Sequence, residues 1–258
     1  MPVGPRAIGE FCWINVLSPS PVEAQSFYRE LLGWEFVELP GMGHIIKVGG
    51  EDIGGIWDLN SPNTPPGTPA GIGVMVRVQS ADAISARANA LGGRGKEAFD
   101  VGPTGRMAEI VDPTGAMIDV WEGHASPGMT ADGMAHGVPS WIELLTPDTA
   151  VAGEFYRQLF GWTSAPMPTG MPGMEYTIFS LGETMAAGMI GITPEMGNFP
   201  PHWACYMNVD DIDAAVATTR ALGGTVHLEP HDIPNVGRIA GITSPHGVMF
   251  YVIRYGPM

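Results

Sequence analysis

The chain has 258 residues, 45% of them hydrophobic, which is enough for two domains of ordinary size that each bury a core. Its formal net charge is −15 and its pI is close to 4.6, so it would repel phosphate backbones and anionic membrane surfaces, and neither nucleic acid nor membrane is an expected partner. The two cysteines, Cys12 and Cys205, lie in apolar runs and form no disulfide framework, and no segment has the length of a membrane span, so we expect a cytoplasmic protein.

In the first half of the chain, the predicted elements alternate between single helices and groups of strands. Residues 12–17 form an apolar run typical of a strand, and Ser20-Pro21-Val22-Glu23 has the pattern of a capping box with proline at the first helical position. Apolar residues four apart then predict a helix that ends at Gly33. The remaining segments, in order, are strands at 35–39, 44–48, 53–57 and 72–78, a helix at 81–91, and three more strands, of which the last is 117–121.

The second half of the chain repeats the first. Residues 13–19, WINVLSP, return as residues 141–147, WIELLTP, at a shift of 128 residues. At the same shift, the Phe-Tyr-Arg of the first helix and the Gly-Trp that follows it return as well. Self-similarity of this kind indicates two copies of one domain. We therefore expect domains over 8–123 and 138–256, joined by a linker over 124–137 that is rich in Gly, Ala and Met.

The order of elements, the Phe-Tyr-Arg helix, the Leu-Gly-Gly after the second helix and the Asp-Pro-x-Gly turn before the last strand resemble the vicinal oxygen chelate superfamily. This superfamily includes glyoxalase I, bleomycin-resistance proteins and extradiol dioxygenases, and the resemblance is closest to its tandem glyoxalase-like proteins. It implies an α+β fold of four βαβββ modules that form two tandem glyoxalase-like domains, each an eight-stranded open cup. Because this fold hosts unrelated chemistries, function must be argued from the site.

In the metal-dependent relatives, side chains of the first, fifth and last strands, sometimes with the fourth, point into the cup as His, His and Glu. They leave an open coordination position for the adjacent oxygens of a substrate. The resemblance places these positions at Trp13, Gly73 and Asp119 in the first copy and at Trp141, Ala204 and Tyr251 in the second. Only Asp119 could ligate a metal, and a hydrogen-bonded carboxylate is its simpler role. No cofactor is therefore favoured, and a divalent Zn, Ni, Mn or Fe is the alternative.

Acidic, imidazole and phenolic side chains gather in the second cup if strand alternation holds. Trp141 and Glu143 share the cup face of the first strand, and the fifth strand directs His202, Tyr206 and Asn208 inward. Desolvation would raise the pKa of Glu143, and His202 could shuttle a proton. Glu143, His202 and Tyr206 are the catalytic candidates, and Trp141, Asn208 and Tyr251 are expected ligand contacts. A structural pair of Glu143 with His202 or with a backbone amide is the alternative reading.

The first cup has lost the glutamate and the histidine. Asn15 stands where the second copy has Glu143, so this cup suits a structural role or a neutral ligand held by Trp13 and Asn15. Arg77 could bind an anionic ligand, although an ion pair with Asp119 or a solvated side chain is the more ordinary expectation.

The sequence thus predicts binding of a small organic molecule in a cup that lacks the usual metal site. Acid–base chemistry of the lyase, isomerase or hydrolase type in the second domain is one reading, and the sequence does not separate an enzyme from a binding protein. One alternative is a metal-dependent glyoxalase or dioxygenase with a rearranged metal site. Another is a non-catalytic protein that sequesters a drug or metabolite, as in bleomycin resistance. Monomer and homodimer both remain open.

Overall fold

The computed structural model describes residues 4–62, 64, 67–168, 175–196 and 199–256. Its first half comprises β1 (Phe11–Ser18), α1 (Pro21–Leu32), β2 (Glu35–Leu39), β3 (Gly43–Val48), β4 (Glu51–Asp58), β5 (Gly71–Arg77), α2 (Ala81–Ala90), β6 (Arg94–Gly95), β7 (Phe99–Val101), β8 (Gly105–Val111) and β9 (Met117–Gly123). Its second half comprises β10 (Pro139–Thr146), α3 (Thr149–Phe160), β11 (Thr163–Pro168), β12 (Glu175–Leu181), β13 (Thr184–Gly191), a short 3-10 helix (Pro194–Met196), β14 (His202–Asn208), α4 (Ile212–Ala221), β15 (Thr225–Ile233), β16 (Gly237–Thr243) and β17 (Met249–Tyr255). None of the helices in these ranges is long and apolar enough to cross a membrane.

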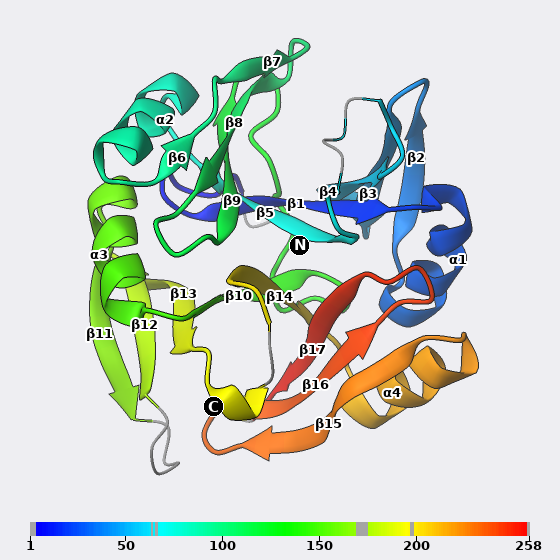
Figure 1. Ribbon diagram of the computed structural model, residues 1–258. Coiled ribbons are helices and arrows are strands. Elements are labelled where there is room, and N and C mark those ends of the chain that lie inside the picture. Colours follow the sequence, from blue (N-terminus) through cyan, green and yellow to red (C-terminus); the bar gives the residue numbers. More distant parts are fainter. Residues whose placement is uncertain (1–3, 63, 65–66, 169–174, 197–198, 257–258) are drawn as a thin grey trace.

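Each half of the chain folds into its own curved sheet (Figure 1). The strand order is β2-β3-β4-β1-β5-β9-β8-β6 in the first sheet, with β7 beside β8, and β11-β12-β13-β10-β14-β17-β16-β15 in the second. The α+β fold of tandem βαβββ modules predicted from the sequence is confirmed. Each concave face is made by one copy, and we call these faces the first cup and the second cup. The first sheet differs in one detail, since β6 and β7 take the place of the single strand β15.

The first helix of each copy ends alike but begins differently. Gly33 and Gly161 follow α1 and α3 in the left-handed conformation, at φ values of 64° and 72°, as a glycine at this position permits. Asp148 caps α3, because its side chain accepts hydrogen bonds from two backbone N–H groups of the first turn. Ser20 makes no such bond to α1, so the predicted capping box is wrong, and Pro21 begins this helix without it.

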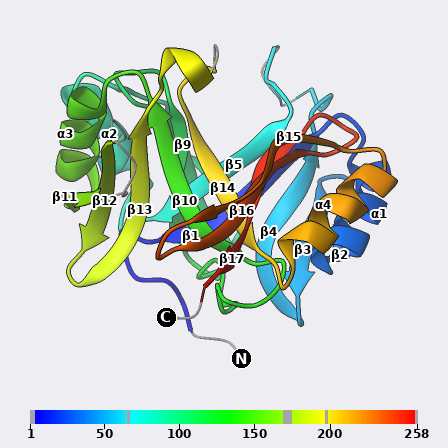
Figure 2. The same cartoon turned by 90° about the horizontal axis from the view of Figure 1, so that it is seen from below.

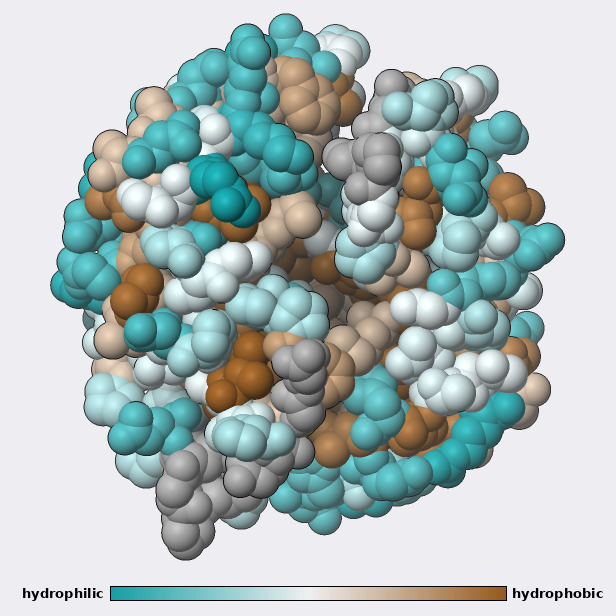
Figure 3. All heavy atoms as spheres, viewed as in Figure 1, coloured by the Kyte–Doolittle hydropathy of each residue, from teal (hydrophilic) through white to brown (hydrophobic). Residues whose placement is uncertain are grey.

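Strand alternation divides each sheet into a core face and a cup face. Along β1, Ile14 and Val16 are buried in the core, whereas Trp13 and Asn15 are partly exposed on the concave side. The convex faces and the helices of both copies share one hydrophobic core, and each cup has a smaller cluster of its own. The space-filling view shows a hollow near the centre of one face, with apolar residues at depth (Figure 3).

The two copies pack around an approximate two-fold relation. Helix α1 contacts α4 on one side of the molecule, and α2 contacts α3 on the other (Figure 2). The repeated tryptophans join the copies, because Trp34 Nε1 donates to the carbonyl oxygen of Gly137 at 2.7 Å and Trp162 Nε1 donates to that of Gly9 at 2.8 Å. Each indole therefore holds the segment that leads into the first strand of the other copy.

Replacing Trp34 or Trp162 by phenylalanine should lower the free energy of unfolding by about 1–3 kcal/mol each, because a buried carbonyl oxygen loses its donor. The two losses should add in the double variant if the bonds act independently. Urea unfolding monitored by circular dichroism measures them. Trp13→Phe is the matched control, since Trp13 lies in the first cup, and an equal loss there would contradict the role of the interdomain bonds.

Candidate functional site

Glu143 lies at the centre of the second cup, on the concave side of β10. Its neighbours across the sheet are Gly188 on β13, which has no side chain, and Ala204 on β14, which has only a methyl group. The hydroxyl of Tyr206 donates a hydrogen bond to Glu143 Oε1 at 2.9 Å. The sequence thus correctly places Glu143 and Tyr206 together, and the structure shows them in direct contact.

The apolar surroundings favour the protonated form of this carboxyl group. Burial raises the pKa of Glu143 above its ordinary value, and hydrogen bonds from Tyr176 and Tyr206 offset only part of that change. Burial and the nearby Glu143 charge raise the pKa of Tyr206 well above its usual range, so this phenol stays a hydrogen-bond donor. A carboxyl group held near its neutral form can give a proton as well as accept one.

Tyr176 on β12 is a site residue that the sequence reasoning missed. Its ring lies over Gly188, because a Cβ atom added to this glycine would be 1.9 Å from the tyrosine hydroxyl oxygen. Trp141 Nε1 donates to the same hydroxyl at 2.9 Å. The first cup builds a similar cover from another strand, since Trp57 on β4 lies over Gly55. The sequence feature that could have indicated Tyr176 is Gly188, a glycine opposite Glu143 that leaves space for a large side chain.

Aromatic rings form one wall of the second cup. Tyr206 and Tyr251 are stacked, with centroids 4.7 Å apart and planes at 19°, as the predicted inward direction of both requires. His227 on β15 meets Tyr251 edge-on at 5.5 Å, and its Nδ1 lies 3.2 Å from Thr243 Oγ1. Burial lowers the pKa of His227, which favours the neutral imidazole. Sequence reasoning missed His227, because irregular pairing in β15 obscures the alternation.

Two predicted members of the second cup have other partners. His202 Nδ1 lies 2.8 Å from the carbonyl oxygen of Pro200, and the residue stands opposite Leu145, next to the Glu143 level of the sheet. Tyr206, and not His202, provides the hydrogen bond to Glu143. The Asn208 amide donates to the carbonyl oxygen of Met134 at 2.6 Å, so it holds the interdomain segment against β14 and is not a free ligand contact.

The first cup contains a half-buried polar pair at the corresponding level. Asn15 Oδ1 accepts a hydrogen bond from Trp57 Nε1 at 2.9 Å, and Asn15 Nδ2 donates to Asp119 Oδ2 at 3.4 Å. Burial, together with the negative charge of Glu109, raises the pKa of Asp119 to about 7. Asp119 is thus a hydrogen-bonded carboxyl group, in line with the simpler of its two predicted roles.

The other predicted residues of the first copy take structural positions. Arg77 Nη1 donates to the carbonyl oxygen of Arg6 at 2.5 Å, so the expected ion pair between Arg77 and Asp119 is wrong. Trp13 packs against a small cluster that contains Met75 and Trp121. The structure therefore places Trp13 in the first cup but directs Arg77 toward the N-terminal segment.

Replacing Asp119 by asparagine should stabilise the protein at neutral pH. Because burial raises the folded-state pKa from 3.8 to about 7, the wild type loses stability as the pH rises through that interval, where only the unfolded chain is ionised. Asparagine resembles the neutral acid and avoids this loss. The gain should be absent near pH 4 and on the order of 2 kcal/mol above pH 7, reduced by residual contact with water. Urea unfolding across this range would contradict the assignment if the gain were independent of pH.

The superfamily's metal positions carry side chains that do not fit a divalent cation. Indole and methyl groups are not ligands, and the phenol of Tyr251 stays protonated because burial raises its pKa. Within the described ranges, no group of three or more His, Cys, Asp or Glu side chains is arranged to hold a metal ion. The donor set of both cups thus disagrees with the usual metal site, and Glu109, the carboxylate paired across the sheet with Asp119, forms an ion pair with Lys96.

Comparisons with known proteins agree with this architecture. Residues 139–252 match the model of the Glyoxalase/Bleomycin resistance protein/Dioxygenase superfamily. The chain is 34% identical to the putative glyoxylase CFP32 of Mycobacterium bovis, over 95% of this chain and 94% of that protein. It is 33% identical to the anthracycline biosynthesis protein DnrV of Streptomyces peucetius, over 96% of this chain and 94% of that protein.

Among solved structures, the homoprotocatechuate 2,3-dioxygenase of Arthrobacter globiformis superposes with a TM-score of 0.67 at 15% identity, covering 98% of this chain and 81% of that chain. At this level of identity the likeness concerns the fold alone. The matches to the two curated relatives, in contrast, cover almost the whole length of both this chain and the relative. This chain therefore belongs to the glyoxalase/bleomycin resistance protein/dioxygenase superfamily, which is the vicinal oxygen chelate superfamily.

Proposed function

We propose that the second cup binds a small, flat organic molecule and that Glu143 acts on it as an acid–base group without a bound metal. The observation that carries this proposal is a half-buried carboxyl group, hydrogen-bonded to Tyr206, in a cup whose walls are largely aromatic and apolar. Enclosing a carboxyl group without a cation costs stability, and carboxyl groups with a raised pKa in a concave site are candidates for proton transfer.

The aromatic walls indicate the ligand class. The stacked rings of Tyr206 and Tyr251 and the indole of Trp141 offer flat surfaces, which suit an unsaturated ring system. The relative from Streptomyces peucetius is named as an anthracycline biosynthesis protein. Since anthracyclines are flat polycyclic compounds with hydroxyl and carbonyl groups, the name supports an aromatic polyketide or a related quinone as the ligand of this chain.

The proposed chemistry is proton transfer between oxygen and carbon of such a ring system. In its neutral form, Glu143 would donate its proton to a carbonyl oxygen or accept the hydrogen bond of a hydroxyl group. Tyr206 would then stabilise the carboxylate that remains, because its hydroxyl already donates to Oε1. His227 lies beside Tyr251, and its neutral imidazole would accept the proton that leaves carbon.

Binding of quinizarin, a dihydroxyanthraquinone, tests the proposal. Quinizarin should quench the tryptophan fluorescence of protein from which metal has been removed with a chelator. Trp141→Ala should weaken this binding at least about tenfold, because it removes one wall and the donor to Tyr176. Trp13→Ala is the matched control from the first copy and should leave the affinity unchanged.

Two results would contradict the proposal. In the first, binding or turnover appears only after Zn, Ni, Mn or Fe(II) is restored, which would support the metal-dependent glyoxalase or dioxygenase alternative. In the second, Trp13→Ala weakens binding and Trp141→Ala does not, which would move the ligand to the first cup. If binding depends on Trp141 but no turnover is found, the second cup is the binding site of a non-catalytic protein that sequesters its ligand.

A further inference from the structure

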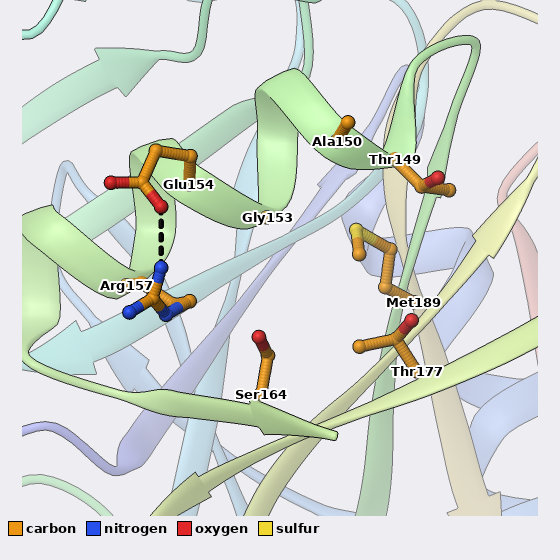
Figure 4. A pocket seen from close by; sticks show the side chains of 8 residues that line it. All are labelled: Thr149, Ala150, Gly153, Glu154, Arg157, Ser164, Thr177 and Met189. Carbon is orange, nitrogen blue, oxygen red and sulfur yellow. Dashed lines mark hydrogen bonds and ion pairs between the residues drawn. The ribbon is translucent and has the colours of Figure 1, made fainter. Parts of the chain in front are cut away.

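A cavity of about 300 Å³ that is open to solvent lies outside both cups, between α3 and strands β11, β12 and β13 (Figure 4). Its lining consists of Thr149, Ala150, Gly153, Glu154, Arg157, Ser164, Thr177 and Met189. In the close view, the hydroxyl groups of Ser164 and Thr177 rise from the strands toward α3, and Arg157 and Glu154 lie side by side on the helix. None of these residues belongs to the proposed acid–base site.

The internal repeat shows which residues open this cavity. At the shift of 128 residues, Gly153 corresponds to Gln25 and Ser164 corresponds to Phe36. Strand pairing matches Thr177 with His44, since Thr177 pairs with Met189 on β13 and His44 with Ile56 on β4. Three large side chains of the first copy have thus become small ones, all around one space.

In the first copy, the same space is filled by a packed group of side chains. Gln25 is only 5% exposed and accepts a hydrogen bond from Arg29 Nη2 at 2.8 Å. The guanidinium group of Arg29 also lies over the ring of Phe36, 5.1 Å from its centroid. This arrangement joins the helix to its sheet and places large side chains where the second copy has Gly153 and Ser164.

In the second copy, the arginine has a different partner. Arg157, the counterpart of Arg29, forms an ion pair with Glu154 one turn earlier in the helix. Gly153 has no side chain, and a Cβ atom added there would only approach the flexible end of Met189, at 3.3 Å. A glycine inside a helix weakens it relative to alanine, so the open space beside Gly153 comes at a cost in helix stability.

The lining also indicates the kind of ligand. The Arg157–Glu154 pair offers hydrogen-bond donors and acceptors without a net charge. The hydroxyl groups of Ser164 and Thr177 can each donate or accept a hydrogen bond. The carboxylate of Glu154 would repel an anion next to Arg157. We propose that this cavity is a second small-molecule site, separate from the cups, that binds a neutral polyhydroxy compound of monosaccharide size.

Restoring the side chain of the first copy tests the proposal. The variant Gly153→Gln should fill the cavity, and Gly153→Ala is the matched control, since it changes helix propensity but leaves the space open. Saturation-transfer NMR with glucose and with glycerol should detect binding to the wild type and to Gly153→Ala. Binding to Gly153→Gln should be at least about tenfold weaker. Ser164→Phe is a second filling variant with the same expected result, for use if Gly153→Gln does not fold.

Three results would overturn this site. One is the absence of glucose and glycerol binding to the wild type. Another is unchanged binding in folded Gly153→Gln and Ser164→Phe. The third is binding of inorganic phosphate or acetate in place of the neutral compounds, which would contradict the ligand class. Quinizarin binding should persist in both filling variants, so that failure of this proposal and failure of the acid–base site are distinguishable.

Discussion

Replacing Glu143 by glutamine should stabilise the protein at neutral pH and remove its proton-transfer activity. Burial raises the folded-state pKa of Glu143, so the folded protein keeps the proton when the unfolded chain has already lost it. The wild type therefore loses stability as the pH rises above 4.5, the ordinary pKa of this carboxyl group. Glutamine resembles the neutral acid, accepts the hydrogen bond of Tyr206 and avoids the loss.

The gain in unfolding free energy for Glu143→Gln should be absent at acid pH and should grow as the pH rises toward neutrality, because the folded wild type keeps a proton that the unfolded chain has lost. Turnover of a ligand that needs proton transfer should fall at least about a hundredfold, since glutamine cannot exchange a proton. Urea unfolding at several pH values and single-turnover kinetics measure the two effects. A variant that is less stable at every pH would mean that Glu143 is structural.

Replacing Gly188 by alanine should disrupt the second cup. The added Cβ would lie 1.9 Å from the Tyr176 hydroxyl oxygen and 3.0 Å from Trp141 Nε1, so Tyr176 must move and its hydrogen bond with Trp141 must break. Overpacking of this kind lowers the free energy of unfolding by about 1–3 kcal/mol. Quinizarin binding should weaken at least about tenfold, because both side chains form the wall that it would contact.

Gly55→Ala is the control for this prediction. Its added Cβ would lie 2.3 Å from the ring of Trp57, so the overpacking is comparable but falls in the first cup. We expect a similar loss of stability and unchanged quinizarin affinity. Equal losses of affinity in the two variants would show that the effect is on the fold as a whole and not on the second cup.

The repeat made the fold predictable, and strand alternation made part of the site predictable. Periods of two and of 3.6 residues depend on local backbone geometry alone, so they correctly place Glu143, Tyr206 and Tyr251 on one concave face. Burial of alternate residues along β1 follows from the same geometry.

Partners that come from distant backbone segments could not be predicted in this way. Arg77 and Asn208 bond to carbonyl oxygens of the N-terminal segment and of the interdomain segment, whose paths have no periodicity. Tyr176 was missed because the shift of 128 residues would match it with Val48, whereas strand pairing matches it with Gly43, opposite Trp57. An odd difference in register moves a side chain to the other face of a sheet, so counting along the chain cannot place this residue.

The most direct test of the proposed site is a carbon-detected NMR titration of the glutamate carboxyl groups in metal-stripped protein, with Glu143→Gln used to assign the signal of Glu143. We predict that the Glu143 signal titrates above the ordinary glutamate range and that quinizarin shifts it. A Glu143 signal that titrates in the ordinary range and does not respond to quinizarin would contradict acid–base chemistry in the second cup.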